Sequence, residues 1–409
     1  MDRRRLIAFG LFVLLALAAL SLAWGSYQAI RKSDDLRLRV FEVAAFVRGE
    51  DPYNRPDMSY PPAAPFVFTP LIAPFQPLAL RIFWLALNLA ALAALCRSVL
   101  VLWGADWPRT LQIAVVLTII AAKPTRLGIG LGQFHLIPTL LVLLAIEAAR
   151  SKREIVAGFL LAIALVKPTM VVPFLIYFAF KGLWRTIGTA VLTQLIATFT
   201  VSLRLGISPV RLMSEWVRNA RLQTSAGVID PASLVAKIAP DLNVSPFFLS
   251  AIVLSIAVWI CIRYRDRSEL GVIAVCSFIS CAFTYHRWYD LVLLVPCFVY
   301  AIDAARRSVG ARAGAIAAFA FAFATIWVLP NNAWDGTIAG RIHEWALVAS
   351  CYLLFALLIF ELERERPAGR RTLELSARSD RSDAALTPNI GRDLSSSIKS
   401  ENAVVSARS

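Results

Sequence analysis

The chain alternates long apolar stretches with short polar segments that are rich in lysine and arginine. A first apolar stretch at about Leu6–Ala29 follows the basic sequence DRRR, and a second covers Leu80–Trp103. About 20 apolar residues in a helix span the hydrocarbon core of a bilayer, so each stretch predicts a membrane crossing. The stretches are continuously apolar and lack the alternation of barrel strands. The pattern therefore predicts an all-α, polytopic integral membrane protein.

The region around Lys167 admits two interpretations. Ile155–Val166 and Thr169–Phe180 are each short for a crossing and together could form one helix kinked at Pro168. In that case the flanking basic sequences ARSKRE and KGLWR would lie on opposite sides of the membrane. Two short helices instead put both sequences in the cytoplasm, as the positive-inside rule favours, and turn Lys167 outward. We therefore expect two short helices here.

The same reasoning, applied to the whole chain, predicts about twelve transmembrane helices with both termini in the cytoplasm. The expected spans also include Leu111–Ala122, Thr186–Val201, Pro246–Ile262, Leu270–Phe283, Leu291–Asp303, Gly314–Leu329 and His343–Phe360. Residues 1–365 then form one transmembrane domain, in which residues 30–79 are the first outer loop with interfacial helices. Residues 366–409 are rich in serine and arginine, and we expect them to form a disordered cytoplasmic tail.

Composition agrees with this class and excludes others. Of the 409 residues, 58% are hydrophobic and 17% charged, whereas soluble domains carry about a quarter of charged residues. The net charge of +15 follows from basic cytoplasmic loops, so no nucleic-acid partner is expected. The six cysteines lie in or at the ends of apolar segments, which predicts packing roles and no disulfide framework. No Cys/His spacing matches a zinc site, so we expect neither a metal nor a cofactor.

The predicted topology gathers distinctive polar residues on the outer side of the membrane. They are the pair Asp34 and Asp35, the insert GEDPYNRPDMSYPP at residues 49–62, KPTRLGIGLGQFH at 123–135, Lys167, YHRWYD at 285–290 and NNAWDG at 331–336. The long loop at 204–245 also lies there, and we expect it to be an ordinary solvated loop. Ionisable groups at membrane depth are costly and tend to line functional cavities. The gathering of these polar residues on one side therefore predicts a functional site at the outer face of the membrane.

Several of these motifs together resemble glycosyltransferase family 87. An acidic residue after the first helix precedes an amphipathic segment ending in RGEDPY, then YPP, a helix with FWLALN, and later GQFH and ALVKPT. The resemblance covers roughly Asp34–Leu183. It implies a GT-C-like helical bundle in the inner membrane of a bacterium, with a periplasmic active site. It also implies transfer of a hexose or pentose, most readily mannose, from a polyprenyl-phosphate sugar to an envelope lipid or glycan, with membrane lipids as further partners.

The implied reaction assigns roles to these residues. A carboxylate must take the proton of the acceptor hydroxyl, and the resemblance places this base at Asp35 or Asp34, with Glu42 as a third candidate. Cations and amide or imidazole donors must stabilise the charge that develops on phosphate. The candidate donor-binding residues are Arg126, Gln133, His135, Lys167, His286, Arg287 and Asp290. His286 and Asp290 are expected to pair on one helical turn.

The insert at residues 49–62 is expected to support the site without catalysing the reaction. Gly49 can end an interfacial helix, and the prolines limit the backbone freedom of the insert. Tyr53 and Tyr60 then form a scaffold beside the catalytic acid. A multispanning transporter or lipid flippase is the alternative function. Such proteins often contain internal repeats, and the absence of an evident repeat here favours the enzyme.

Overall fold

The structure is a computed structural model of residues 1–409. It describes residues 2–55, 58–223, 227–239, 241–242, 244–307 and 337–365, and the statements below concern that part of the chain. The expected span Gly314–Leu329, the sequence NNAWDG and the tail 366–409 lie outside the described residues. The chain divides into a unit Met1–Glu363, which holds the helices discussed below, and a unit Arg364–Ser409.

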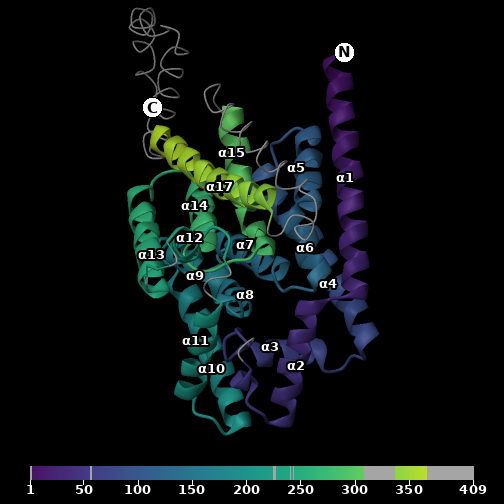
Figure 1. Cartoon of the computed structure of the whole chain (residues 1–409). Coiled ribbons are helices and arrows are strands. Elements are labelled where there is room, and N and C mark those ends of the chain that lie inside the picture. Colours follow the sequence, from purple (N-terminus) through teal and green to yellow (C-terminus); the bar gives the residue numbers. More distant parts are fainter. Residues whose placement is uncertain are drawn as a thin grey trace, which may run out of the picture. The chain divides into compact units, whose positions relative to one another are not determined.

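Every regular element in the described ranges is helical (Figure 1). In chain order they are α1 (Arg3–Arg31), α2 (Asp34–Arg48), the short η1 (Pro52–Asn54), α3 (Ala64–Ile72), α4 (Pro77–Val99), η2 (Leu100–Gly104), α5 (Arg109–Ala121), α6 (Lys123–Leu131), α7 (Leu136–Arg150), α8 (Glu154–Ala164), α9 (Pro168–Phe180), α10 (Trp184–Leu205), α11 (Pro209–Leu222), α12 (Pro231–Ile238), α13 (Pro246–Arg263), α14 (Glu269–Ala282), η4 (Trp288–Leu294), α15 (Val295–Arg307) and α17 (Ile338–Arg364). α1 packs along α5 and α6, and α14 contacts α9, α13 and α15.

Six helical stretches among the described residues are long and apolar enough to cross a membrane. They are Arg4–Arg48, Pro77–Gly104, Trp184–Leu205, Pro246–Arg263, Trp288–Arg307 and Glu344–Arg364. α5 and α6 are bent by 44° relative to each other and add a seventh if they form one broken span. α8, α9 and α14 are apolar but shorter. The prediction of a polytopic all-α membrane protein is confirmed, whereas the number of twelve crossings stays a prediction.

The chain breaks between α8 and α9, so two helices form around Lys167 instead of one kinked helix. Pro168 is the first residue of α9, where proline lacks only an N–H group that the helix would leave unpaired. The sequence Lys-Pro-Thr also occurs at Lys123–Thr125, where it begins α6 after the bend. Each Lys-Pro-Thr sequence therefore places a lysine at the start of a short helix.

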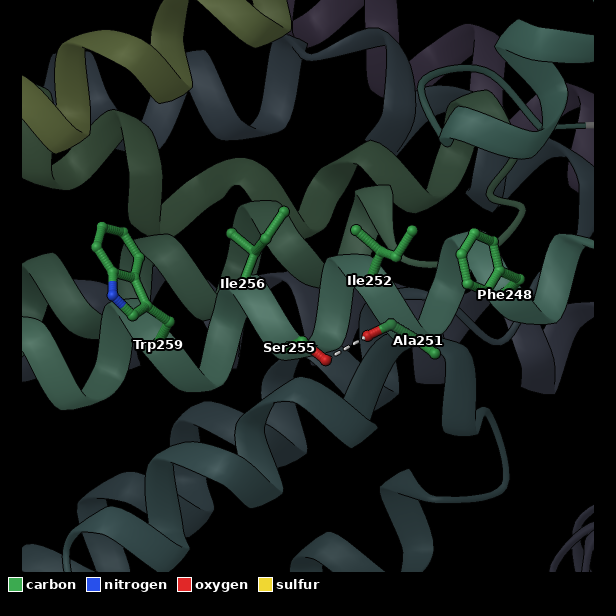
Figure 2. Close-up of a pocket in the computed structure, with 6 residues that line it drawn as sticks. All are labelled: Phe248, Ala251, Ile252, Ser255, Ile256 and Trp259. Atoms are coloured by element: carbon green, nitrogen blue, oxygen red, sulfur yellow. Dashed lines mark hydrogen bonds between the residues drawn. The ribbon is translucent and has the colours of Figure 1, made fainter.

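Large apolar side chains are exposed along several of the long helices, as expected for surfaces that face lipid. Examples are Phe9, Phe12 and Leu20 on α1, Leu192 and Phe199 on α10, and Phe248 and Trp259 on α13. Figure 2 shows a groove of about 470 Å³ on α13, lined by Phe248, Ala251, Ile252, Ser255, Ile256 and Trp259. The Ser255 hydroxyl donates a hydrogen bond to the Ala251 carbonyl, 2.8 Å away. The groove is therefore apolar and resembles a lipid contact more than a site for chemistry.

Loops that were predicted to be cytoplasmic meet at one end of the helices. Arg150 Nη2 lies 2.7 Å from Glu269 Oε2, which joins the loop after α7 to the loop before α14. Arg263 Nη2 lies 3.2 Å from Glu363 Oε1 at the end of α17. Arg306 at the end of α15 donates to the carbonyl of residue 106, 3.4 Å away. The basic loops therefore form one connected polar end of the molecule.

Beyond the C-terminal end of α1, the chain forms the separate helix α2, and its location at the membrane interface stays a prediction. α2 ends at Arg48, and Gly49 follows with a φ of 76°, the left-handed conformation that glycine adopts without strain. The insert that comes next is held by α11. Asn219 Nδ2 donates to the carbonyl oxygens of Tyr53, Arg55 and Met58 at 3.2, 2.9 and 3.2 Å. A side chain more than 160 residues away in sequence thus fixes the backbone of the insert.

The region 204–245 differs from the solvated loop that the sequence suggested. α11 packs Leu212 against Tyr53 and Met58, and Trp216 Nε1 donates to the Ser59 carbonyl at 2.9 Å. Leu212, Trp216 and Asn219 are spaced by four and three residues, so they share one face of the helix. The other face carries arginines, which made the segment look like a solvated loop.

Replacing Asn219 by alanine should loosen the insert without unfolding the protein. The substitution leaves three buried or partly buried carbonyl groups without a donor, at a cost of about 1–3 kcal/mol for an unsatisfied group. Amide hydrogen exchange over residues 51–60 should therefore become about tenfold faster or more. Arg218→Ala changes the neighbouring exposed residue and serves as the control. Equal exchange rates in the two variants would show that α11 does not hold the insert.

Candidate active site

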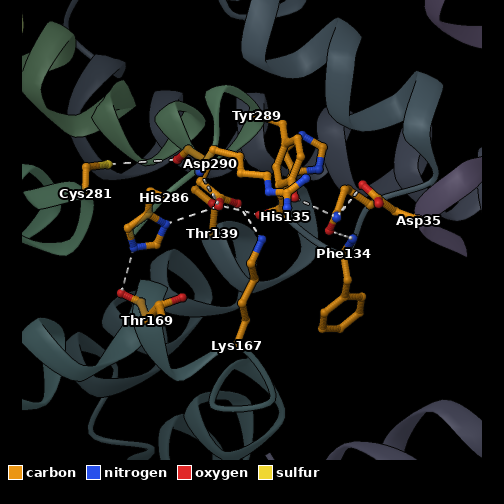
Figure 3. A network of polar contacts seen from close by, with 12 residues as sticks. Asp35, Phe134, His135, Thr139, Lys167, Thr169, Cys281, His286, Tyr289 and Asp290 are labelled. Atoms are coloured by element: carbon orange, nitrogen blue, oxygen red, sulfur yellow. Dashed lines mark hydrogen bonds and ion pairs between the residues drawn. The ribbon is translucent and has the colours of Figure 1, made fainter. Parts of the chain in front are cut away.

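Gln133 lies at the centre of a polar network whose members come from distant parts of the sequence, among them Asp35 and Tyr289, which are labelled in Figure 3. Its Nε2 donates to Asp35 Oδ2 at 2.6 Å and to the Tyr289 hydroxyl oxygen at 2.9 Å. Its Oε1 accepts from the Tyr60 hydroxyl at 3.4 Å and from the Phe134 amide at 3.2 Å. A carboxylate only accepts hydrogen bonds, so the amide nitrogen must face Asp35. Gln133 therefore uses both N–H donors and orients the carboxylate.

The backbone before Gln133 is fixed by a tight turn. α6 ends at Leu131, and Gly132 caps it with a φ of 69°. A Cβ atom at Gly132 would lie 2.8 Å from the Leu36 Cβ of α2, so glycine also permits the close approach of the two segments. Trp84 Nε1 donates to the Gly132 carbonyl at 2.8 Å. The turn therefore brings Gln133 to the start of α2.

Asp35 differs from the two other candidate carboxylates in its surroundings. It is half-buried, and one of its oxygens is held by Gln133. Asp34 is exposed, and no hydrogen bond joins it to the described part of the network. Glu42 is buried and forms an ion pair with Arg39 at 2.6 Å. Asp35 is therefore the candidate base that the structure brings to the network.

Lys167 and Asp290 form a buried ion pair beside this network, and Figure 3 shows the lysine pointing at the carboxylate. Asp290 Oδ2 also accepts from the Arg287 amide at 3.3 Å and lies 3.2 Å from His286 Nδ1. His286 Nε2 lies 3.2 Å from the Thr169 carbonyl oxygen. Asp290 therefore contacts three groups, the Lys167 ammonium, the Arg287 amide and the His286 ring, and joins them into one polar cluster.

The predicted pairing of His286 with Asp290 is formed, but in a different local structure. Residues 285–287 are not helical, and Asp290 lies in the first turn of the 3-10 helix η4. The carboxylate accepts from the backbone amide of Arg287 and thereby caps this turn. The cap orients Asp290 towards Lys167 without an α-helical turn.

Three consecutive residues of η4, Trp288 to Asp290, contact the lysines of the two Lys-Pro-Thr sequences. Lys123 Nζ lies 4.1 Å from the centroid of the Trp288 ring, and Lys167 Nζ lies 4.9 Å from that of Tyr289. Both contacts have cation–π geometry. Lys123 is 2% exposed, and neither it nor Tyr289 was singled out in the sequence. The repeated Lys-Pro-Thr sequence is the feature that could have identified Lys123, because the lysine of each copy contacts η4.

Other candidate residues lie at the edge of the network. Arg126 is half-buried on α6, and no hydrogen bond or ion pair joins it to the described members of the network. Arg287 is exposed, and its Nη2 donates to Gln223 Oε1 at 3.3 Å. The Tyr53 hydroxyl donates to the Tyr60 carbonyl at 2.7 Å, which fits the expected scaffold role of both tyrosines. Tyr60 therefore joins the contacts around Gln133 through its hydroxyl, whereas the side chains of Arg126 and Arg287 lie outside the hydrogen bonds of the described network.

Burial controls the protonation of two groups that lie in loops beside the membrane-spanning helices. Burial lowers the pKa of His135 to about 3, and the charge of Lys167 acts in the same direction. Burial also raises the pKa of the Tyr60 hydroxyl well above its ordinary value. At neutral pH the imidazole is therefore uncharged, and Tyr60 keeps the proton that it donates to Gln133. In the described part of the chain, no three His, Cys, Asp or Glu side chains are arranged to hold a metal ion.

Comparison with known proteins agrees with the geometry. Neither the curated proteins nor the solved structures contain a match to this chain. A protein-family model, that of glycosyltransferase family 87, matches residues 59–284. The match includes Gln133 and Lys167, and it leaves Asp35 before it and Asp290 after it. Because it spans more than half of the sequence, the chain belongs to glycosyltransferase family 87.

Proposed function

We propose that this membrane glycosyltransferase transfers a hexose or pentose, most readily mannose, from a polyprenyl-phosphate sugar to an envelope lipid or glycan. The observation that carries the proposal is the arrangement around Gln133. It holds a half-buried carboxylate, Asp35, close to the polar cluster of Lys167, Asp290 and His286. A base and a phosphate-binding cluster in one place are what such a transfer requires.

Asp35 acts as the general base in this reaction. One carboxylate oxygen is bound by Gln133, and the other is left to accept the proton of the acceptor hydroxyl. The hydroxyl oxygen forms a bond to the anomeric carbon of the sugar as the bond from that carbon to the phosphate oxygen breaks. The electron pair of the broken bond leaves with the polyprenyl phosphate. The base is needed because a neutral hydroxyl is a poor nucleophile.

Lys167 stabilises the phosphate that departs. It is already paired with Asp290, but that carboxylate also accepts from the Arg287 amide, and the lysine ammonium has three N–H donors, so it can bind a phosphate oxygen as well. α6 carries further positive charge, because Lys123 at its start lies against the Trp288 ring of η4 and Arg126 follows on the next turn of the helix. In a water-poor site such charges act strongly on the charge that develops in the transition state.

The direct test uses purified protein in lipid and a panel of radiolabelled polyprenyl-phosphate sugars with membrane-lipid and glycan acceptors. Transfer from at least one such donor is expected, with the label recovered in the acceptor. Donors that carry the same sugars on nucleoside diphosphates are the matched comparison and should give no product. Transfer from nucleotide sugars alone would overturn the proposed donor, and the absence of transfer and of donor hydrolysis across the panel would overturn the proposed activity.

We further propose that the protein lies in the inner membrane of a bacterium, with the site at the periplasmic face and both termini in the cytoplasm. The polar end formed by Arg150, Arg263 and Arg306 supports this orientation, because basic loops favour the cytoplasm. Reporter fusions after Lys181 and after Arg263 should therefore be active only as cytoplasmic reporters, and a fusion after Gly206 only as an outer one. An outer signal at Lys181 or Arg263 would contradict this orientation.

A further inference from the structure

His135 is a buried side chain of the site whose hydrogen-bonding groups are unused. The residue is fully buried, and neither Nδ1 nor Nε2 has a hydrogen-bond partner among the described residues. The backbone of Gln133 and of Pro124 lies near the ring without forming a hydrogen bond of normal geometry. A buried polar group without a partner costs about 1–3 kcal/mol, and such groups are rare in folded proteins. The two ring nitrogens are therefore available to hydrogen-bond a group that does not belong to the chain.

The space that the His135 ring occupies exists because a neighbouring position is glycine. A Cβ atom at Gly128 would lie 1.8 Å from Cε1 and 2.1 Å from Nε2 of the imidazole, so only glycine at position 128 leaves room for the ring. The Thr139 hydroxyl donates to the His135 carbonyl at 2.9 Å and fixes the backbone at the start of α7. The ring meets Tyr289 edge-on, with 6.0 Å between centroids. An apolar ring would fill this space without unsatisfied nitrogens.

The chemistry of the ring selects the type of ligand group. A neutral imidazole offers one N–H donor and one nitrogen acceptor. A hydroxyl group matches that pair, because it both donates and accepts. A phosphate oxygen only accepts hydrogen bonds and therefore suits the ammonium groups of Lys123 and Lys167, which lie at η4, better than a neutral imidazole. We propose that His135 hydrogen-bonds a hydroxyl group of the transferred sugar and thereby determines which sugar the enzyme accepts. The proposal rests on the proposed function.

The test compares the preferred donor with analogues that lack one sugar hydroxyl at a time. The wild-type enzyme should favour the parent sugar over one of these deoxy analogues by about 100-fold or more in kcat/KM, because a site built to bind a hydroxyl leaves a buried group unpaired without it. In His135→Phe, which keeps the ring and removes both nitrogens, this preference should fall to less than about tenfold. Its melting temperature should equal or exceed that of the wild type. His135→Asn restores one donor and one acceptor and should recover part of the preference.

Tyr264→Phe is the matched control, since it removes one polar group from a buried ring in the loop after α13, where the hydroxyl donates to Glu363 at 2.8 Å. It should leave the preference among the deoxy donors unchanged. Wild-type preference at every hydroxyl in His135→Phe would overturn the proposal and leave the ring a packing residue. A lower melting temperature with an even loss of activity on all donors would overturn it as well. If the wild-type protein transfers no sugar, the proposed function fails instead.

Discussion

Replacing Asp35 by asparagine should lower the rate of sugar transfer by about 10²–10⁴-fold, the usual contribution of a general base. The amide cannot accept the proton of the acceptor hydroxyl, although it has almost the same shape as the carboxylate. The asparagine Oδ1 can still accept a hydrogen bond from Gln133 Nε2, so the fold should be unaffected. Binding of the donor lipid should change far less than kcat, because the base acts on the acceptor. Single-turnover transfer and equilibrium binding of the donor measure the two effects separately.

Asp34→Asn is the closest control for this experiment. It removes the same charge one residue earlier, on the exposed side of the helix start. Activity should stay within a few-fold of the wild type, because an exposed carboxylate at a helix end contributes less than about 1 kcal/mol. A large loss in Asp34→Asn with full activity in Asp35→Asn would exchange the roles of the two residues. Full activity in both would show that the base lies elsewhere.

Local features of the fold could be read from the sequence because they depend on neighbouring residues. The end of α2 at Gly49 follows from the conformational freedom of glycine, and the start of α9 follows from Pro168. The polarity of residues 285–290 likewise marked His286 and Asp290 as a pair, although η4 is not an α-helix. Each of these features lies within a few residues of its cause.

The contacts that assemble the site could not be read in this way. Gln133 meets Asp35 across 98 residues and Tyr289 across 156, and no local pattern encodes such pairs. The sequence therefore named Asp35 and Gln133 as candidates without indicating which side chains they contact. It also named Arg126 and not Lys123, although Lys123 precedes a proline just as Lys167 does. The bend between α5 and α6 buries Lys123 against Trp288, and that bend is a tertiary feature.

The ion pair of Lys167 and Asp290 should behave differently in single and double variants. The two side chains are 12% and 5% exposed, so removing one partner leaves a charge in a buried place. Lys167→Met and Asp290→Asn should each lose about 3–5 kcal/mol of stability, the usual cost of breaking a buried pair. The double variant removes both charges and should recover most of that loss. Thermal unfolding in detergent and the folded fraction on size-exclusion chromatography would measure these differences.

Activity separates a structural role of the pair from a role in phosphate binding. If Lys167 stabilises the departing phosphate, the double variant should fold well and still transfer sugar about 10²–10³-fold more slowly, the effect of losing one charge-stabilising group. His286 would keep its contact with the Thr169 carbonyl, so the remaining network supplies the internal control. Recovery of wild-type transfer together with stability would instead show that the pair only holds α9 against η4. The phosphate would then be bound by the cations of α6, and Lys123→Met would become the variant with the larger effect.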